Sequence, residues 1–182
     1  ALSASSGQAP GADSPLHGFK PCEAVPCGLI TLEMPEAILQ ERLGRICEER
    51  GFIVPQGNLH ALCLSQIPRT LNLATDLPMI EALIQRHRLK FVVIDTLARA
   101  MNSAETQEFM RPIIREIELM CVRNDCTICL VHHDRKAPSD GKSDGIGLDS
   151  ARGSGDLGGF VRWGIQVTPS PGDVRRITCT AN

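Results

Sequence analysis

Aromatic residues are scarce in this 182-residue chain, which has one Trp, five Phe and no Tyr. Proteins that hold single-stranded nucleic acid often stack bases on aromatic side chains, and few are available here. The chain also lacks a large excess of charge of one sign, because 19 basic and 21 acidic residues give a net charge of −2. Any binding to nucleic acid must therefore come from a local basic segment rather than from the overall charge.

Long apolar runs are also absent. The chain contains no uninterrupted apolar stretch of about 18 residues, the length that a membrane-spanning helix needs. Its first residues do not form the charged-then-apolar pattern of a signal peptide. We therefore expect a soluble, cytoplasmic protein with no membrane partner. The first residue is Ala1 rather than Met, which indicates a processed product or a fragment.

The eight cysteines lack the dense spacing of a secreted disulfide scaffold. Cys126 and Cys129 form a CxxC pair, but they lie in an apolar run typical of a strand, where residues three apart point to opposite faces. We therefore expect neither a shared metal nor a disulfide there. Cys22 and Cys27 have zinc-like spacing but no second pair to complete a site.

Strand and helix patterns alternate from residue 28 onward. Residues 1–27, rich in Ala, Ser, Gly and Pro, are expected to form a flexible leader or a truncated remnant. The remainder, 28–182, predicts one α/β domain with a mostly parallel sheet, flanking helices and a C-terminal β-hairpin. The expected strands are 28–33, 59–64, 91–95, 126–131, 160–168 and 174–180, and the expected helices are 36–50, 77–88 and 105–124.

Three of the predicted strands end in polar side chains: Glu33, Asp95 and the pair His132–His133. The carboxyl ends of parallel strands meet at one edge of the sheet, where open α/β sheets bind ligands. One carboxylate there can activate a water, another can anchor a magnesium ion, and a histidine can bond to a phosphate. Purely structural roles stay open for each: a charge at a helix N-terminus, a helix cap and a core histidine.

A polar, glycine-rich segment covers residues 137–159 and contains Gly141-Lys142-Ser143, which resembles the end of a phosphate-binding loop. The full motif requires a glycine at position 136, where this chain has lysine, and no Gly-x4-Gly-Lys-Ser/Thr occurs anywhere in it. The segment is predicted to be a loop with Lys136, Lys142 and Arg152 available to phosphates. A solvated surface loop is the equally weighted alternative.

Five short segments then occur in a recognisable order: Leu-Glu-Met-Pro (32–35), Val-Val-Ile-Asp-Thr-Leu (92–97), Val-His-His-Asp (131–134), Ala-Arg-Gly-Ser (151–154) and Val-Arg-Trp (161–163). Each is weak alone, but together the five are specific. The combination resembles the RecA-like P-loop ATPases, an AAA-type group, and in particular the hexameric replicative helicases of plasmids of the RepA type. The resemblance covers residues 28–182.

The resemblance implies a role for each matching residue. Glu33 corresponds to the glutamate that activates water, and Asp95, followed by Thr96, to the Walker B aspartate that holds Mg²⁺ with ATP. His133, or as second choice His132, corresponds to the histidine that reads the γ-phosphate. Arg162 corresponds to an arginine finger that reaches the neighbouring subunit's nucleotide. Lys136, Lys142 and Arg152 lie in or beside the loop that faces DNA, and Arg152 is also a candidate nucleotide contact.

Two functions follow from these implications. The first is a fragment of a helicase-type ATPase that couples ATP hydrolysis to movement on single-stranded DNA in replication. This function implies a homo-oligomer, with a hexameric ring as its expected form. The leader stands where the family has its phosphate-binding loop, so we expect the chain to begin after that loop. The alternative is a RecA-like module that assembles or regulates without turning over ATP.

Overall fold

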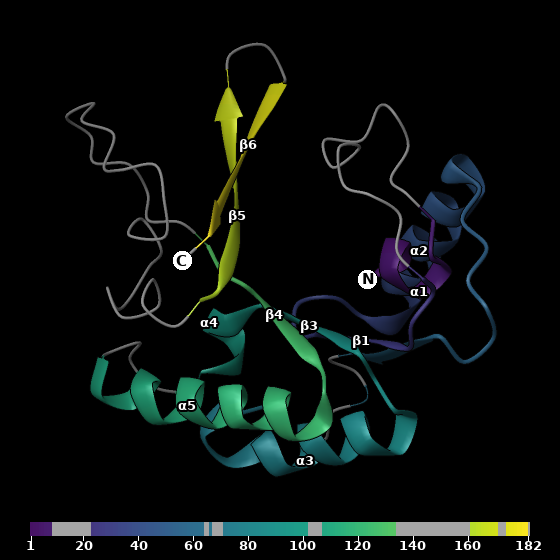
Figure 1. Cartoon of the computed structure of the whole chain (residues 1–182). Helices are drawn as coiled ribbons and strands as arrows, with labels where there is room; N and C mark the ends of the chain where they lie inside the picture. The colour runs from purple at the N-terminus through teal and green to yellow at the C-terminus, as the bar shows by residue number, and fades with distance from the viewer. Residues whose placement is uncertain are drawn as a thin grey trace.

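The computed structural model describes residues 1–8, 23–63, 66, 71–101, 107–133, 161–170 and 174–181. Four parallel strands form the central sheet in the order β2-β1-β3-β4 (Figure 1). They are β1 (Cys27–Thr31), β2 (Leu59–Cys63), β3 (Phe91–Asp95) and β4 (Thr127–Val131). An antiparallel hairpin of β5 (Trp163–Ser170) and β6 (Val174–Ala181) forms a second sheet. The predicted α/β fold, with its parallel sheet and C-terminal hairpin, is confirmed.

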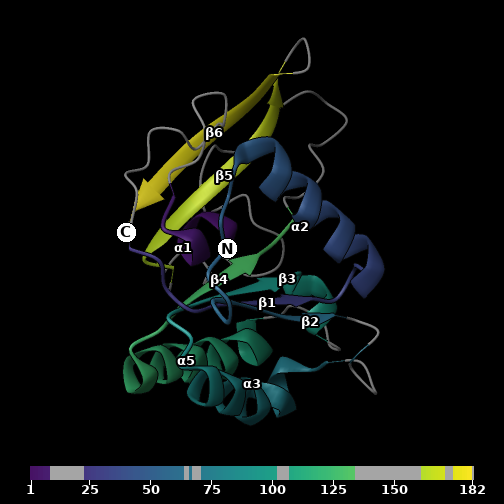
Figure 2. The ribbon, with the colours of Figure 1, turned by 90° about the vertical axis from the view of Figure 1, so that its right-hand side faces the viewer.

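The helices lie on both sides of the sheet. Helices α3 (Leu73–His87) and α5 (Gln107–Asn124) run side by side across one face, and α1 (Leu2–Ser6) and α2 (Glu36–Arg50) lie on the opposite side (Figure 2). The hairpin also lies on the side of α1 and α2, away from α3 and α5 (Figures 1 and 2). A short helix, α4 (Leu97–Ala100), follows β3.

The main core fills the layer between the sheet and helices α3 and α5. In β3, Val92 and Ile94 are buried while Phe91, Val93 and Asp95 are half-buried, because alternate residues of a strand point to opposite faces. Each buried aliphatic side chain of this size contributes about 1.5–3 kcal/mol. The buried partners from the helices and β1 include Ile30, Leu77, Ile80, Ile84, Ile113, Ile117 and Met120.

Helix α3 begins earlier than the sequence predicts, at Leu73 rather than residue 77. Asn72 provides the reason: its side chain accepts a hydrogen bond from the backbone N–H of Ala74 at 3.0 Å. The backbone N–H of Asn72 in turn donates to the carboxylate of Asp76 at 2.8 Å. These bonds satisfy groups that a helix start leaves open, so Pro78 lies inside the helix rather than at its beginning.

The first residues of the chain form an element that the sequence pattern does not reveal. Ser5 in α1 is buried, and the backbone N–H of Val25 donates to the carbonyl of Ala4 at 3.0 Å. The side chain of Gln8 donates to the carbonyl of Gly51 at 3.0 Å and accepts from the N–H of Ile53 at 2.7 Å. Within the predicted leader, residues 1–8 are thus bonded to the segment after α2, and residues 9–22 lie outside the described part of the chain.

Helix α2 has the predicted bounds but is only lightly packed. Leu39 is its single buried residue, although helical spacing places the apolar residues Ile38 and Ile46 on the same side of the helix. Both isoleucines are exposed. None of the helices in the described ranges combines the length and the apolar composition that a membrane-spanning segment requires.

Truncating the core should cost much more than truncating an exposed isoleucine. Ile80 is fully buried, whereas Ile53 is 78 % exposed, so Ile80→Ala is expected to lower the free energy of unfolding by about 2–5 kcal/mol. The matched control Ile53→Ala should change it by less than about 0.5 kcal/mol. Urea unfolding of the two variants checks this, and equal losses would contradict the assignment of the core.

Candidate functional site

Glu33 and Asp95 meet at the carboxyl edge of the sheet, as predicted from their positions after two strands. Thr31, the last residue of β1, pairs with Asp95, the last residue of β3. One residue further, the backbone N–H of Leu32 donates to the carbonyl of Asp95 at 2.7 Å. The hydroxyl of Thr96 donates to the carboxylate of Glu33 at 3.1 Å. The ends of the two strands are therefore tied together by both backbone and side chains.

Arg99 joins this cluster, and sequence reasoning missed it. Its guanidinium Nε lies 3.6 Å from Oε1 of Glu33, the same oxygen that accepts from Thr96. The position follows from α4, which starts directly after Thr96 and carries Arg99 within its single turn. Both side chains are exposed, so the ion pair itself adds about 0–1 kcal/mol at most. Its importance is that it orients the carboxylate and places a cation at the edge.

Asp95 is held in surroundings that oppose its negative charge. Burial raises the pKa of its carboxyl above the usual range, and the nearby Glu33 carboxylate raises it further, while His133 acts in the opposite direction. A carboxyl with a raised pKa gains from a cation that offsets desolvation and repulsion. The same interactions show that His133 is close enough to Asp95 to influence its charge.

The two histidines differ in exposure. His133 is exposed and His132 is half-buried. Both follow β4, which pairs with β3 so that Val131 lies opposite Asp95. The structure thus gathers Glu33, Asp95, Thr96 and His133 at one edge, with His132 next to them in the chain.

Thr31 adds an unsatisfied polar group to the same edge. Its hydroxyl is buried and has no hydrogen-bond partner within the described part of the chain. A buried hydroxyl without a partner costs about 1–3 kcal/mol and calls for a bound water or ligand. Because Thr31 pairs with Asp95 in the sheet, this unsatisfied hydroxyl lies at the same edge as Asp95.

The remaining predicted residues are not brought to this cluster. Arg162 is exposed and directly precedes β5, which begins near the edge where the parallel strands begin rather than where they end (Figure 2). An arginine finger acts on a neighbouring subunit, so its expected role stays a prediction. Lys136, Lys142 and Arg152 lie outside the described residues.

The donor set at the edge fits magnesium. In the described ranges no group of three or more His, Cys, Asp and Glu side chains converges on a metal position. Mg²⁺ does not need such a cage, because it keeps several waters and uses one or two carboxylates with substrate phosphates. Asp95 and the hydroxyl of Thr96 offer oxygen ligands of that kind. Cys126 offers no thiolate, because burial raises its pKa to about 12.

The free-energy cost of the Asp95 charge predicts whether removing this charge raises or lowers the stability of the protein. Because the folded protein raises the pKa of Asp95, ionisation near neutral pH destabilises the folded state relative to the unfolded one. Without divalent cations, Asp95→Asn should therefore raise the melting temperature at about pH 7.5, and the gain should vanish below the unfolded pKa of about 3.9. Thermal unfolding at the two pH values measures this.

Asp125 is a control of opposite sign. Its carboxylate accepts a hydrogen bond from Lys90 at 2.7 Å, which lowers its pKa. Asp125→Asn should therefore leave the protein slightly less stable at neutral pH, not more. If Asp95→Asn also lost stability, this would contradict the conclusion that the folded protein disfavours the charged form of Asp95.

Comparison with known proteins assigns the chain to a family. No curated protein matches the sequence. A family model described as "AAA domain" matches residues 1–139, which include β1 to β4, Glu33, Asp95 and both histidines. The match covers more than half of the chain and agrees with the parallel sheet and its polar carboxyl edge. The chain therefore belongs to the AAA-domain family of RecA-like P-loop nucleoside triphosphatases.

Proposed function

We propose that this chain is part of a RecA-like, helicase-type ATPase that couples ATP hydrolysis to movement on single-stranded DNA in the cytoplasm. The observation that supports this most is the joined edge, where Thr96 and Arg99 both contact Oε1 of Glu33 beside Asp95. Such an edge offers a base, a cation ligand and a phosphate donor within one small region.

Glu33 is the proposed base that takes a proton from the attacking water. The hydrogen bond from Thr96 and the ion pair with Arg99 both engage Oε1, which leaves Oε2 free of any bond among the described residues to accept that proton. Asp95 would hold Mg²⁺, assisted by Thr96, and the exposed His133 would donate a hydrogen bond to a phosphate oxygen. Magnesium bound with ATP neutralises the charge that develops on the phosphates.

The proposed function also requires partners. Arg162 would act in trans as an arginine finger, because β5, which directly follows it, begins away from the carboxyl edge of the parallel strands. This implies a homo-oligomer, and we propose a hexameric ring. Single-stranded DNA would be contacted by the basic residues Lys136, Lys142 and Arg152.

A second candidate is a non-catalytic module that assembles or regulates without turning over ATP. One observation favours it: the sequence contains no Gly-x4-Gly-Lys-Ser/Thr motif. In P-loop enzymes the backbone N–H groups and lysine of that motif hold the phosphates. The two candidates differ in whether the protein releases phosphate from ATP.

Replacing the proposed base should abolish turnover but not binding. Glu33→Gln keeps the shape of the side chain and removes its basicity, so phosphate release should fall by about 10²–10⁴-fold with little change in ATP affinity. Glu48→Gln on the outer side of α2 is the matched control and should keep full activity. Malachite-green detection of phosphate with Mg²⁺, ATP and single-stranded DNA provides the measurement. Undiminished release from Glu33→Gln would refute the proposed base, and ATP binding without release from the unmodified protein would favour the second candidate.

Mixing two inactive variants tests the shared site. Glu33→Gln subunits keep Arg162, and Arg162→Ala subunits keep Glu33, so about a quarter of the interfaces in a random equal mixture regain both groups. Activity should therefore return on mixing to about a quarter of the unmodified level, because a finger can contribute about 10³–10⁵ in rate. Full activity of Arg162→Ala alone, or a mixture as inactive as its components, would exclude the finger in trans.

A further inference from the structure

The β5–β6 hairpin has one apolar face and one polar face. Its register pairs Trp163 with Ala181, Ile165 with Cys179 and Val167 with Ile177. Alternation places Trp163, Ile165, Val167, Ile177 and Cys179 on the same side. Gln166, Thr168 and Thr178 occupy the other side. The pattern is that of a sheet with one face against a core and one against solvent.

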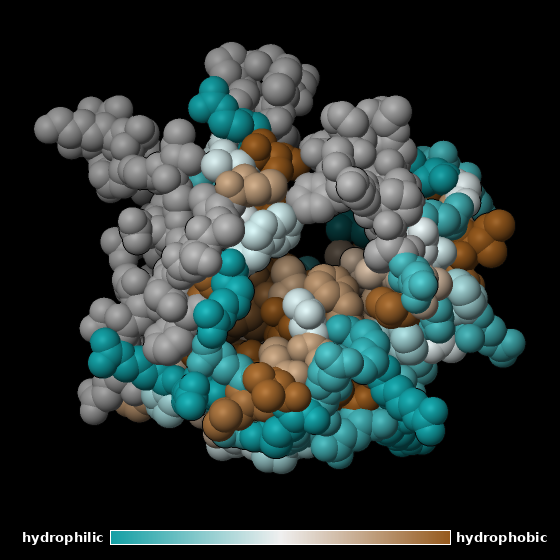
Figure 3. Space-filling model, viewed as in Figure 1, coloured by the Kyte–Doolittle hydropathy of each residue, from teal (hydrophilic) through white to brown (hydrophobic). Residues whose placement is uncertain are grey.

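Along β5, the exposure of the two faces is the reverse of this expectation. Trp163, Ile165 and Val167 are 46 %, 41 % and 56 % exposed, whereas Gln166 and Thr168 on the polar face are half-buried. Apolar surface is visible over the hairpin in Figure 3. A two-stranded hairpin is only marginally stable by itself, so an exposed apolar face of this kind marks an interaction surface.

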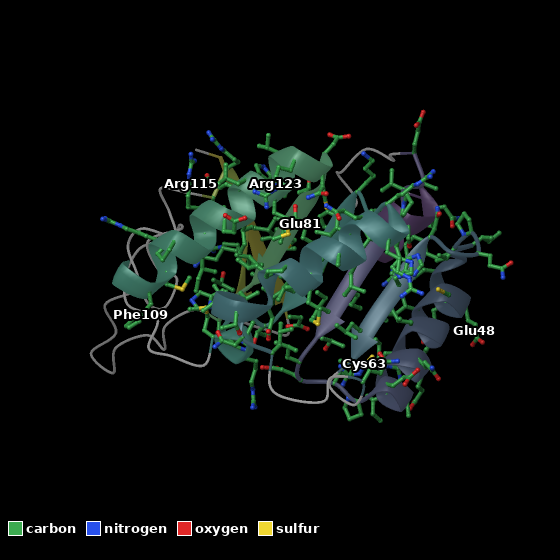
Figure 4. The ribbon with its side chains drawn as sticks, turned by 90° about the horizontal axis from the view of Figure 1, so that it is seen from below. Glu48, Cys63, Glu81, Phe109, Arg115 and Arg123 are labelled. Carbon is green, nitrogen blue, oxygen red and sulfur yellow. The ribbon has the colours of Figure 1, made fainter. Side chains whose placement is uncertain are left out.

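A groove between α3 and α5 is lined by apolar side chains and is therefore a suitable surface for the apolar face of the hairpin. It has a volume of about 400 Å³, and its apolar lining includes Leu77, Ile113 and Phe109. Phe109 is 53 % exposed, although it lies at helical spacing from the buried residues Ile113 and Ile117. Figure 4 shows Phe109 toward the beginning of α5, and Glu81 farther along, between the two helices.

The groove also carries a negative charge. Glu81 and Glu116 line it, and Arg123 donates to them at 3.0 Å and 2.7 Å. Two carboxylates share this one guanidinium, so their local sum is −1. The groove is therefore apolar along its length and acidic at one end.

Charge and size both favour a contact between the hairpin and this groove. Residues 161–182 contain three arginines and one aspartate, a net charge of +2, so the rest of the chain has −2 − 2 = −4. Two positively charged hairpins would repel each other. The positively charged hairpin of one copy is instead attracted to the negatively charged remainder of another copy. The apolar stretch of β5, from Trp163 to Val167, is about 16 Å long, and the part of α5 that lines the groove, from Phe109 to Met120, is about 18 Å long.

The contact must join two copies of the chain. The hairpin lies on the side of α1 and α2, and the groove lies on the opposite side of the sheet (Figures 1 and 2). We propose that the apolar face of β5, anchored by Trp163, docks into the α3–α5 groove of a neighbouring copy. This inference rests on the proposed homo-oligomer and supplies its interface. A contact between two different surfaces repeats head to tail, so it generates a ring or a filament.

Trp163 suits the role of anchor, because tryptophan is strongly enriched among residues that dominate binding energy. It is also the single tryptophan of the chain, so its fluorescence reports directly on its surroundings. Raising the concentration of the full chain without nucleotide or DNA should shift its emission to shorter wavelength, in step with assembly measured by sedimentation velocity.

Variants of the groove decide the outcome. Phe109→Glu places a charge in the groove and should weaken association at least tenfold. Val122→Glu adds the same charge to the same helix at a position that is 80 % exposed and outside the groove, and it should associate like the unmodified chain. Trp163→Ala tests the other surface by sedimentation and should weaken association similarly, which keeps the test decisive if Phe109→Glu fails to fold.

Three results would overturn the docking: emission independent of concentration, equal association of Phe109→Glu and Val122→Glu, or a shift that requires a single-stranded oligonucleotide, which would reassign the face to nucleic acid. The outcome is separable from the proposed function. If the unmodified chain associates as proposed but does not turn over ATP, only the proposed ATPase is contradicted. If the chain turns over ATP and Phe109→Glu associates as well as the unmodified chain, only this interface is contradicted.

Discussion

The in-register pairing of β1 with β3 is the constraint on which the candidate site depends. It sets Thr31 opposite Asp95 and continues into the 2.7 Å hydrogen bond from the N–H of Leu32 to the carbonyl of Asp95. A shift of one residue would turn Asp95 to the other face of the sheet, because strand side chains alternate. The acidic edge is therefore a product of sheet register, and register is fixed in turn by the buried residues Val92 and Ile94 beneath α3 and α5.

The strands and the convergence of their ends were predictable because the signals are local. A short apolar run ending in a carboxylate defines both a buried strand and the position of its polar end, as at Phe91–Asp95. Helix α4 was not predictable in this way, since four residues are too few to show a helical period. Arg99 was missed for that reason. A signal existed, however: an arginine four residues after Asp95 falls within reach of the same edge.

Burial could be predicted less well than secondary structure. The helical period of α5 is clear, yet Phe109 is exposed, because a period identifies a face but not what covers it. The same holds for Ile38 and Ile46 in α2 and for the apolar face of the hairpin. Asn72 illustrates a different limit, since a single side-chain bond to the N–H of Ala74 moved the start of α3.

The light packing of α2 makes this helix easier to displace than α3, which covers the opposite face of the sheet. Helix α2 begins at Glu36, three residues after Glu33, and buries only Leu39. Helix α3, of equal length, buries five residues. Displacing α2 thus exposes far less apolar surface to water than displacing α3, so it is the less costly of the two to move. If Glu33 changed its position, α2 would tilt, while α3, α5 and the core between them and the sheet would stay in place.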